Sequence, residues 1–162
     1  MADYSPEILA ATDRSLLDLM LDTQRAEIAA LLEGVTDAEA QVRLVPSLTT
    51  LLGLVKHATF VERVWFAHRV DGRSRAEVGL PDEIDDSFRL TAEDTIASVL
   101  ADFAAACETS RRIASEHSEL TETFPWRLGP VSLAFIYAHM IQEYARHCGH
   151  GDILREQILA AR

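Results

Sequence analysis

Apolar residues recur every three or four positions through four long stretches of the chain. This spacing places them on one side of a helix, because an α-helix has 3.6 residues per turn. Gly34 follows the first stretch as a stop signal, and Thr91-Ala92-Glu93-Asp94 opens the third with a sequence similar to a capping box. No stretch alternates apolar and polar residues over the length of a useful strand. The predicted helices cover residues 15–32, 49–70, 91–117 and 132–159.

The longest connection between predicted helices joins the second to the third and covers residues 71–90. It contains glycine, proline and a cluster of acidic residues. A connection of this length allows a crossover rather than a tight hairpin, and it is the best candidate for a lid. We therefore predict an all-α four-helix bundle, with residues 1–162 forming a single domain.

Glutamate and histidine side chains interrupt the apolar side of two predicted helices. In the last helix, Glu143, His147 and His150 follow Met140 at spacings of three and four, where apolar residues are expected. In the second helix, His57 lies in the middle of the apolar side. Burying such groups costs on the order of several kcal/mol unless they are paired or coordinate a metal. The pattern predicts one metal site between two helices.

The spacing also selects the candidate ligands. Glu143 and His147 are one helical turn apart, so both side chains can reach one ion. With His57 they make three protein ligands, which leave coordination positions open, as in catalytic zinc sites. His150 is either a fourth ligand or a neighbour that orients the ligands. The alternatives are an exposed Glu143–His147 pair, worth about 0.3 kcal/mol, and a hydrogen-bonded core histidine at position 57.

Three further histidines fit the site less well. His139 precedes Glu143 by one turn but lies about 12 Å along the helix from His147, too far for all three to share an ion. His68 and His117 fall at the ends of predicted helices, where an imidazolium complements the helix dipole. Tryptophans 65 and 126 are expected to be packing residues, and the second could also line the mouth of a pocket.

Composition narrows the class of protein. The formal net charge of -11 argues against a nucleic-acid partner. Cys107 and Cys148 are too few for a disulfide framework, and Cys148 is expected to be a small buried apolar residue. No run approaches the roughly 20 apolar residues of a membrane span, and residues 1–6 lack a basic stretch followed by an apolar run. We therefore expect a cytoplasmic protein with no membrane partner.

His57 in the second helix, together with Glu143-x-x-x-His147-x-Gly149-His150 in the last, resembles the DinB-like (YfiT-like) metal-binding superfamily. That superfamily includes the mycothiol-dependent maleylpyruvate isomerases. The resemblance covers nearly the whole chain in helix order and length. A glutamate at the first position of the final pair is similar to the mycothiol-dependent isomerase branch. His150 stands where glutamine is common, and residues 144–156 are similar to an actinobacterial branch.

The resemblance implies a divalent metal held by His57, Glu143 and His147, with zinc first and nickel or iron as alternatives. It also implies a mycothiol-like thiol cosubstrate, a small electrophile as the second substrate, and a homodimer. In such an enzyme the ion lowers the pKa of the thiol, whose thiolate then attacks the electrophile in a transfer or isomerisation. Two alternatives remain: a metal-dependent hydrolase, and a non-catalytic, stress-associated metal-binding dimer.

Overall fold

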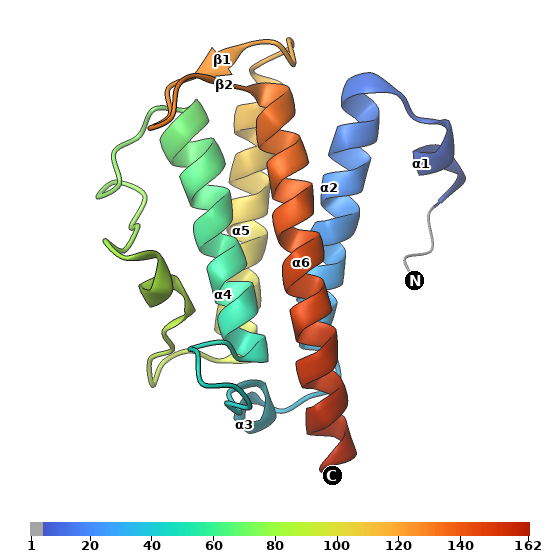
Figure 1. Cartoon of the computed structure of the whole chain (residues 1–162), viewed down its shortest axis with the longest axis vertical. Helices are drawn as coiled ribbons and strands as arrows, with labels where there is room; N and C mark the ends of the chain where they lie inside the picture. The colour runs from blue at the N-terminus through green and yellow to red at the C-terminus, as the bar shows by residue number, and fades with distance from the viewer. Residues whose placement is uncertain (1–4) are drawn as a thin grey trace.

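The computed structural model describes residues 5–162 and confirms the all-α architecture. Residues 1–4, part of the segment in which no secretory signal is expected, lie outside the described range. The elements are α1 (Pro6–Ala10), α2 (Asp13–Ala30), α3 (Asp37–Ala40), α4 (Leu51–Glu62), η1 (Arg63–Val70), η2 (Ile84–Phe88), α5 (Ile96–Ser115), β1 (Thr123–Phe124), β2 (Val131–Ser132) and α6 (Leu133–Ala160). The long helices α2, α4, α5 and α6 form the bundle, and the two short strands lie across one end of it (Figure 1).

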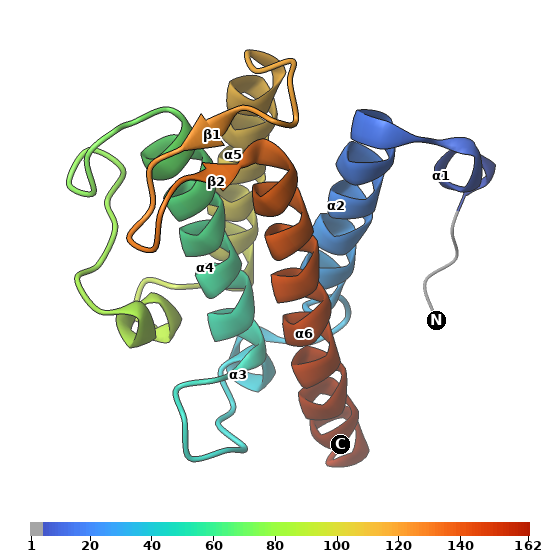
Figure 2. The same cartoon turned by 45° about the horizontal axis from the view of Figure 1, so that its top comes forward.

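The direction of the helices shows that the long connection is a crossover. Helices α2 and α6 run one way along the bundle, whereas α4 and α5 both run the other way (Figure 1). Because α4 and α5 are consecutive and parallel, residues 71–95 have to return along the length of the bundle, and they do so on the outer side of α4 (Figures 1 and 2). We call residues 71–95 the crossover segment.

The apolar sides of the four helices meet in one core. Leu21, Ile28, Leu54, Ile113 and Met140 come from all four helices, and each is at most 1% exposed. Burying a side chain of this size stabilises the fold by about 1.5–3 kcal/mol. Helix α2 packs against α6, and α4 packs against both α5 and α6. The two helices that carry the predicted ligands are therefore neighbours.

The third long helix begins five residues later than the prediction of 91. Thr91 does bind Asp94 through its backbone N–H, at 2.6 Å, but Asp94 also forms an ion pair with Lys56 of α4. The helix starts after Thr95, whose hydroxyl accepts the N–H of Ser98 while the Ser98 hydroxyl accepts the N–H of Thr95. The prediction that Thr91 caps this helix is wrong, because the contact with Lys56 holds Asp94 in the preceding turn.

Two further features differ from the predicted helices. The second predicted helix continues without a break from α4 into η1, which winds as a π-helix and ends with the Asp71 N–H donating to the Phe66 carbonyl. Strands β1 and β2 pair antiparallel, with Thr123 opposite Ser132, and are too short for an alternating pattern to predict them.

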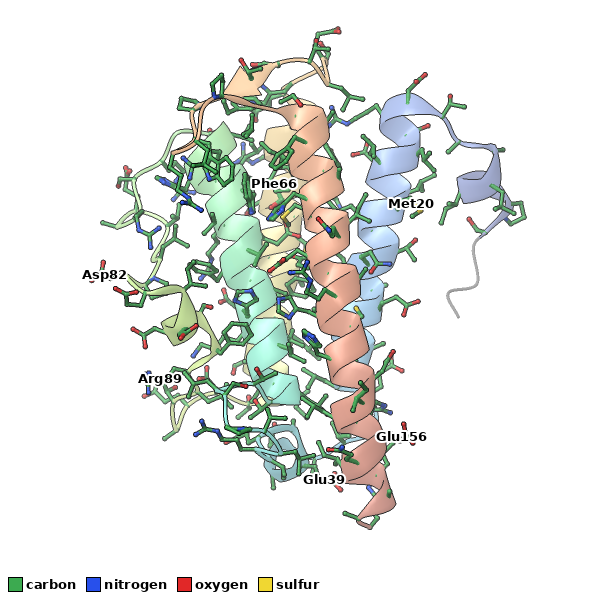
Figure 3. All side chains as sticks on the ribbon, viewed as in Figure 1. Met20, Glu39, Phe66, Asp82, Arg89 and Glu156 are labelled. Atoms are coloured by element: carbon green, nitrogen blue, oxygen red, sulfur yellow. The ribbon has the colours of Figure 1, made fainter. Side chains whose placement is uncertain are left out.

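Side chains of the bundle and of the crossover segment differ in where they point. Phe66 lies inside the bundle, whereas Asp82 and Arg89 of the crossover segment point outward (Figure 3).

No helix within residues 5–162 combines the length and the apolar character that a membrane span requires.

Candidate metal centre

Three potential donor side chains meet between α4 and α6. His57 projects from the middle of α4, and Glu143 and His147 lie one turn apart on α6. One donor atom from each residue lies within 4.8 Å of the other two. The helices run antiparallel and side by side, so the fold joins His57 to a pair that is distant in sequence (Figures 1 and 2).

The two distances from the Glu143 carboxylate to the imidazoles are close to those that one small cation requires. Glu143 Oε1 lies 3.1 Å from His147 Nε2 and 3.6 Å from His57 Nε2. Zinc–ligand bonds of about 2.0–2.1 Å at a tetrahedral angle place neighbouring donor atoms about 3.3 Å apart. Two imidazoles and one carboxylate also form a donor set that several divalent transition metals accept. The residues present therefore fit a divalent cation.

The second ring nitrogen of His57 is bound by the crossover segment. His57 Nδ1 lies 2.7 Å from the hydroxyl of Ser87, a residue of η2 that is 4% exposed. The Ser87 hydroxyl donates its single proton to the carbonyl of Ile84, so it accepts the Nδ1 proton of His57. This hydrogen bond leaves the Nε2 lone pair directed toward Glu143, as in metal sites whose ligand histidines are oriented by an outer partner.

Packing around His57 favours its neutral form. The Phe88 ring stacks on the imidazole, with ring centroids 3.9 Å apart and an interplanar angle of 11°. Burial lowers the pKa of His57 below its ordinary value, although Glu143 acts in the opposite direction. A neutral imidazole is the form that ligates a metal.

Glu143 and His147 complete the cluster in different ways. The His147 imidazole, hydrogen-bonded at 3.1 Å, and the nearby His57 imidazole hold the pKa of Glu143 well below its usual range, although burial opposes this shift. The carboxylate is therefore ionised at neutral pH. His147 Nδ1 is buried and has no hydrogen-bond partner among residues 5–162. Ser87 thus orients the His57 ring through Nδ1, whereas no residue of the same range binds Nδ1 of His147.

The other predicted histidines lie outside this cluster. His150 is exposed on α6, and its ring centroid is 5.7 Å from that of His147. His139 is half-buried and packs on Trp65. Two more bind locally: His68 Nδ1 lies 2.6 Å from the Arg73 carbonyl, and His117 Nδ1 lies 2.9 Å from Glu122.

Both cysteines are free and buried. Burial raises the pKa of the Cys148 thiol to about 12, and burial also raises the pKa of Cys107, with help from the nearby Glu62 carboxylate. Neither thiol is therefore a nucleophile at neutral pH, and the structural role predicted for Cys148 agrees with its burial.

The sequence-based interpretation did not identify Glu62 as a carboxylate of the core. Glu62, at the end of α4, is 0% exposed. Both of its oxygens accept from the Arg25 guanidinium at 2.8 Å, and Glu62 Oε1 also accepts the Tyr144 hydroxyl at 2.8 Å. Arg25 is 6% exposed, so this pair lies in the core as an internally neutralised unit.

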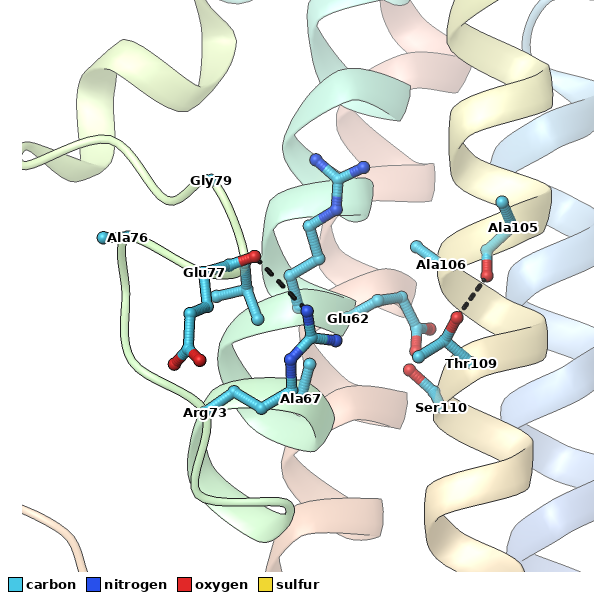
Figure 4. A pocket seen from close by; sticks show the side chains of 12 residues that line it. Glu62, Ala67, Arg73, Ala76, Glu77, Gly79, Ala105, Ala106, Thr109 and Ser110 are labelled. Atoms are coloured by element: carbon cyan, nitrogen blue, oxygen red, sulfur yellow. Dashed lines mark hydrogen bonds between the residues drawn. The ribbon is translucent and has the colours of Figure 1, made fainter.

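A cavity of about 450 Å³ lies apart from the candidate metal centre, between η1, α5 and the crossover segment. Its lining includes Glu62, Arg73, Thr109 and Ser110 (Figure 4). Thr109 donates its hydroxyl proton to the Ala105 carbonyl. None of the three candidate metal donors lines this cavity.

The structure is a helical bundle that holds a cluster of two histidines and one carboxylate between two of its helices. The family model described as "Mycothiol-S-transferase" matches residues 16–160. The chain therefore belongs to the mycothiol-S-transferase family, a DinB/YfiT-like family, as the resemblance implied.

Comparison with solved structures supports the same fold. The chain is similar to a crystal structure described as a conserved protein from Enterococcus faecalis, with a TM-score of 0.72 and 17% sequence identity. The match covers 93% of this chain and 99% of the other. At this identity the likeness shows the fold alone. No curated protein sequence matches the chain.

Proposed function

We propose that this protein is a divalent-metal-dependent transferase that moves mycothiol onto a small electrophile. Membership of the mycothiol-S-transferase family supports the thiol and the class of reaction. The observation that carries the metal dependence is the convergence of His57 Nε2 and His147 Nε2 on one oxygen of Glu143, at 3.6 and 3.1 Å.

His57, Glu143 and His147 would hold the cation, with zinc as the first choice and nickel or iron as alternatives. Bound there, the cation would lower the pKa of a thiol that coordinates it and so keep the sulfur in its nucleophilic thiolate form. Three protein ligands leave coordination positions for a substrate. Glu143 and His147 keep 22% and 13% of their side chains exposed, whereas His57 keeps 5%, so access is from the α6 side.

The residues around the centre orient and protect it. Ser87 holds the His57 imidazole with Nε2 toward the shared position, and Phe88 covers one face of the ring. In the transfer, a bond forms between the thiol sulfur and the electrophilic carbon, and the bond from that carbon to its leaving group breaks. The leaving group departs with the electron pair, and the thiol proton passes to solvent. No protein side chain is assigned as a base.

Metal analysis of single variants tests the ligand set. His57→Ala and His147→Ala should each lose bound zinc in elemental analysis. His117→Ala changes a partly buried histidine that lies outside the cluster and pairs with Glu122, and it should retain zinc. Full retention of zinc by both site variants would remove the proposed centre.

Activity measurements separate the enzyme from its alternatives. Mycothiol consumption with a panel of electrophiles should stop when the metal is removed by chelation and return when zinc is added. Unchanged consumption without metal would exclude metal dependence. Ester or amide hydrolysis without thiol consumption would indicate the hydrolase. A fall in melting temperature on chelation, with no thiol binding, would indicate a structural metal. Light scattering of the purified protein tests the proposed homodimer.

A further inference from the structure

Aromatic rings continue the line of the candidate donors along α6. Phe135 and His139 precede Glu143 in steps of four residues, and each step is about 6 Å of helix rise. Residues at this spacing lie on one side of the helix. The rings of Phe135 and His139 are stacked, with centroids 5.9 Å apart and planes at 9°. The side of α6 that carries Glu143 therefore becomes aromatic toward its N-terminal end.

Two tryptophans from distant parts of the chain join these rings. Trp65 of η1 lies 4.7 Å from His139, and Trp126, between β1 and β2, lies 6.1 Å from Phe135 (centroid distances). The two indoles are 5.8 Å apart. We call Trp65, Trp126, Phe135 and His139 the aromatic shelf.

The loop that carries Trp126 is anchored to the bundle. Arg69, four residues after Trp65, donates to the Pro125 carbonyl at 2.9 Å. This bond holds the loop against η1 and so places Trp126 beside Trp65. The shelf is thus assembled from a helix, a hairpin loop and the first turns of α6.

Part of the shelf is uncovered. Phe135 is 43% exposed and is the only aromatic residue among the large, exposed apolar side chains of residues 5–162. His139 and Trp126 are partly exposed, and neither ring nitrogen of His139 has a hydrogen-bond partner among the same residues. Covering exposed aromatic surface is favourable by roughly 25 cal/mol per Å², and offset or edge-on ring contacts add to this. The uncovered rings thus offer binding energy along α6, with His139 about 6 Å and Phe135 about 12 Å of helix rise from Glu143.

We propose that the aromatic shelf binds a flat aromatic group of the electrophile and points its reacting carbon toward His57, Glu143 and His147. The inference rests on the proposed function and specifies the substrate class: an uncharged aromatic electrophile whose ring lies two or three bonds from the reacting carbon. This separation matches the one-turn step from His139 to Glu143. Among residues 5–162 the rings contact each other rather than a carboxylate, and Arg127 is the one cation over them, 5.4 Å from the Trp126 ring.

The kinetic test compares two electrophiles with the same reacting group. Zinc-loaded protein is assayed with mycothiol and either iodoacetamide or N-phenyl-iodoacetamide. In both reactions the sulfur–carbon bond forms, the carbon–iodine bond breaks, iodide leaves with the electron pair and the thiol proton goes to solvent. After correction for the uncatalysed rates, kcat/KM should favour the phenyl compound about tenfold, because one apolar group is commonly worth 10- to 200-fold in an enzyme pocket.

Matched variants on α6 locate the source of this preference. Phe135→Ala should reduce the preference for the phenyl compound about fivefold, by the same reasoning. Ile153→Ala removes another exposed apolar side chain, at 59% exposure, and should keep the preference. An equal preference in the wild type and in Phe135→Ala would overturn the shelf as the aromatic subsite.

A binding measurement with an unreactive compound tests the aromatic shelf independently of the transfer reaction. Both tryptophans of the chain lie in the shelf, so a spectrum of indole N–H groups contains two signals, which Trp126→Phe assigns. Acetanilide, which cannot react, should shift both signals, and acetamide should shift neither. Transfer to iodoacetamide with no shift by acetanilide would reject the shelf and keep the proposed function. Shifts by acetanilide without thiol transfer would keep the shelf and reject the proposed function.

Discussion

Glu62 on α4 and Glu143 on α6 are two carboxylates held inside the same bundle, and their neighbours differ. Glu62 is fully buried and receives two hydrogen bonds from the Arg25 guanidinium and one from the Tyr144 hydroxyl. Glu143 is flanked by two imidazoles, and no arginine or lysine of residues 5–162 pairs with it. One carboxylate is paired with a guanidinium of the chain itself, and the other faces two imidazoles.

This difference separates a structural from a candidate functional carboxylate. Burying an ionised group without a partner costs more free energy than several ordinary contacts contribute. The Glu62 carboxylate is therefore tolerated in the core because Arg25 pairs with it. Around Glu143 there is no guanidinium or ammonium partner among residues 5–162, and a divalent cation held by the three donors would neutralise the carboxylate. Tyr144 directly follows Glu143 in sequence and points into the core toward Glu62. Two adjacent residues of α6 therefore belong to different groups: Glu143 is part of the candidate metal centre, and Tyr144 binds the buried Glu62.

Removal of the internal cation should have the largest effect on folding. Arg25→Met leaves Glu62 buried and unpaired and should lower the free energy of unfolding by about 3–5 kcal/mol. Urea denaturation measures the change. The double variant Arg25→Met, Glu62→Leu removes both charges and should recover most of the loss. A small effect of Arg25→Met would show that Glu62 does not depend on its guanidinium partner.

Substitution of Glu143 should change metal affinity far more than metal-free stability. Glu143→Gln removes the negative charge but keeps the size of the side chain, and zinc affinity should fall at least about 100-fold, since the loss of an outer partner alone typically costs 10- to 100-fold. Titration against a competing chelator measures the affinity. The matched variant Glu156→Gln changes an exposed carboxylate of the same helix and should bind zinc as the wild type does. Equal zinc affinity in both variants would contradict the role of Glu143 as a metal donor.

Chelation should lower the melting temperature only where Glu143 is intact. A ligand at 100 times its dissociation constant stabilises the folded state by about 2.7 kcal/mol, so the zinc-loaded wild type should melt at a higher temperature than its chelated form. Glu143→Gln should melt at nearly the same temperature in zinc and in chelator. Calorimetry at fixed protein concentration measures both, and a zinc-dependent shift in Glu143→Gln equal to that of the wild type would contradict the prediction.

Loss of the Ser87 hydroxyl should weaken the centre more moderately. Ser87→Ala leaves His57 Nδ1 without its hydrogen-bond partner, and zinc affinity should fall about 10- to 100-fold. Proteolysis of the crossover segment should also become faster, because the segment loses a bond to α4. Ser115→Ala changes an exposed serine on α5 and serves as the control for both measurements. Unchanged affinity would mean that Ser87 does not orient His57.

Acid should produce the smallest effect, and its sign follows from the lowered pKa of Glu143. The pKa of Glu143 is depressed in the folded state relative to its usual 4.5, so its stabilising contribution is complete above pH 4.5 and is lost as the pH falls toward the folded value. In metal-free protein, the stability difference between the wild type and Glu143→Gln should therefore shrink as the pH falls below 4.5. Urea titrations at several pH values measure it, and a difference that grows with acid would contradict the sign.

The apolar periodicity determined the four long helices to within a few residues at most ends, because a helix buries one side and that side repeats every 3.6 residues. Helix starts were less certain: the capping pattern at Thr91 and the real cap at Thr95 are locally similar, and the long-range pair between Lys56 and Asp94 belongs to tertiary structure. The hairpin β1–β2 has too few residues for a periodic signal.

The sequence by itself also marked His57, Glu143 and His147, because polar donor residues at apolar positions are costly unless something binds them. It could not place His150, which the structure leaves exposed. Only the tertiary structure brought Ser87 to His57, Arg25 to Glu62, Trp65 to the ring of His139, and Trp126 to Trp65. The first two contacts join residues 30 or more positions apart in the sequence. Trp126 lies in the loop between β1 and β2, which has no regular structure. Local periodicity carries no information about them, since it reports which side of a helix is buried and not which neighbour covers it.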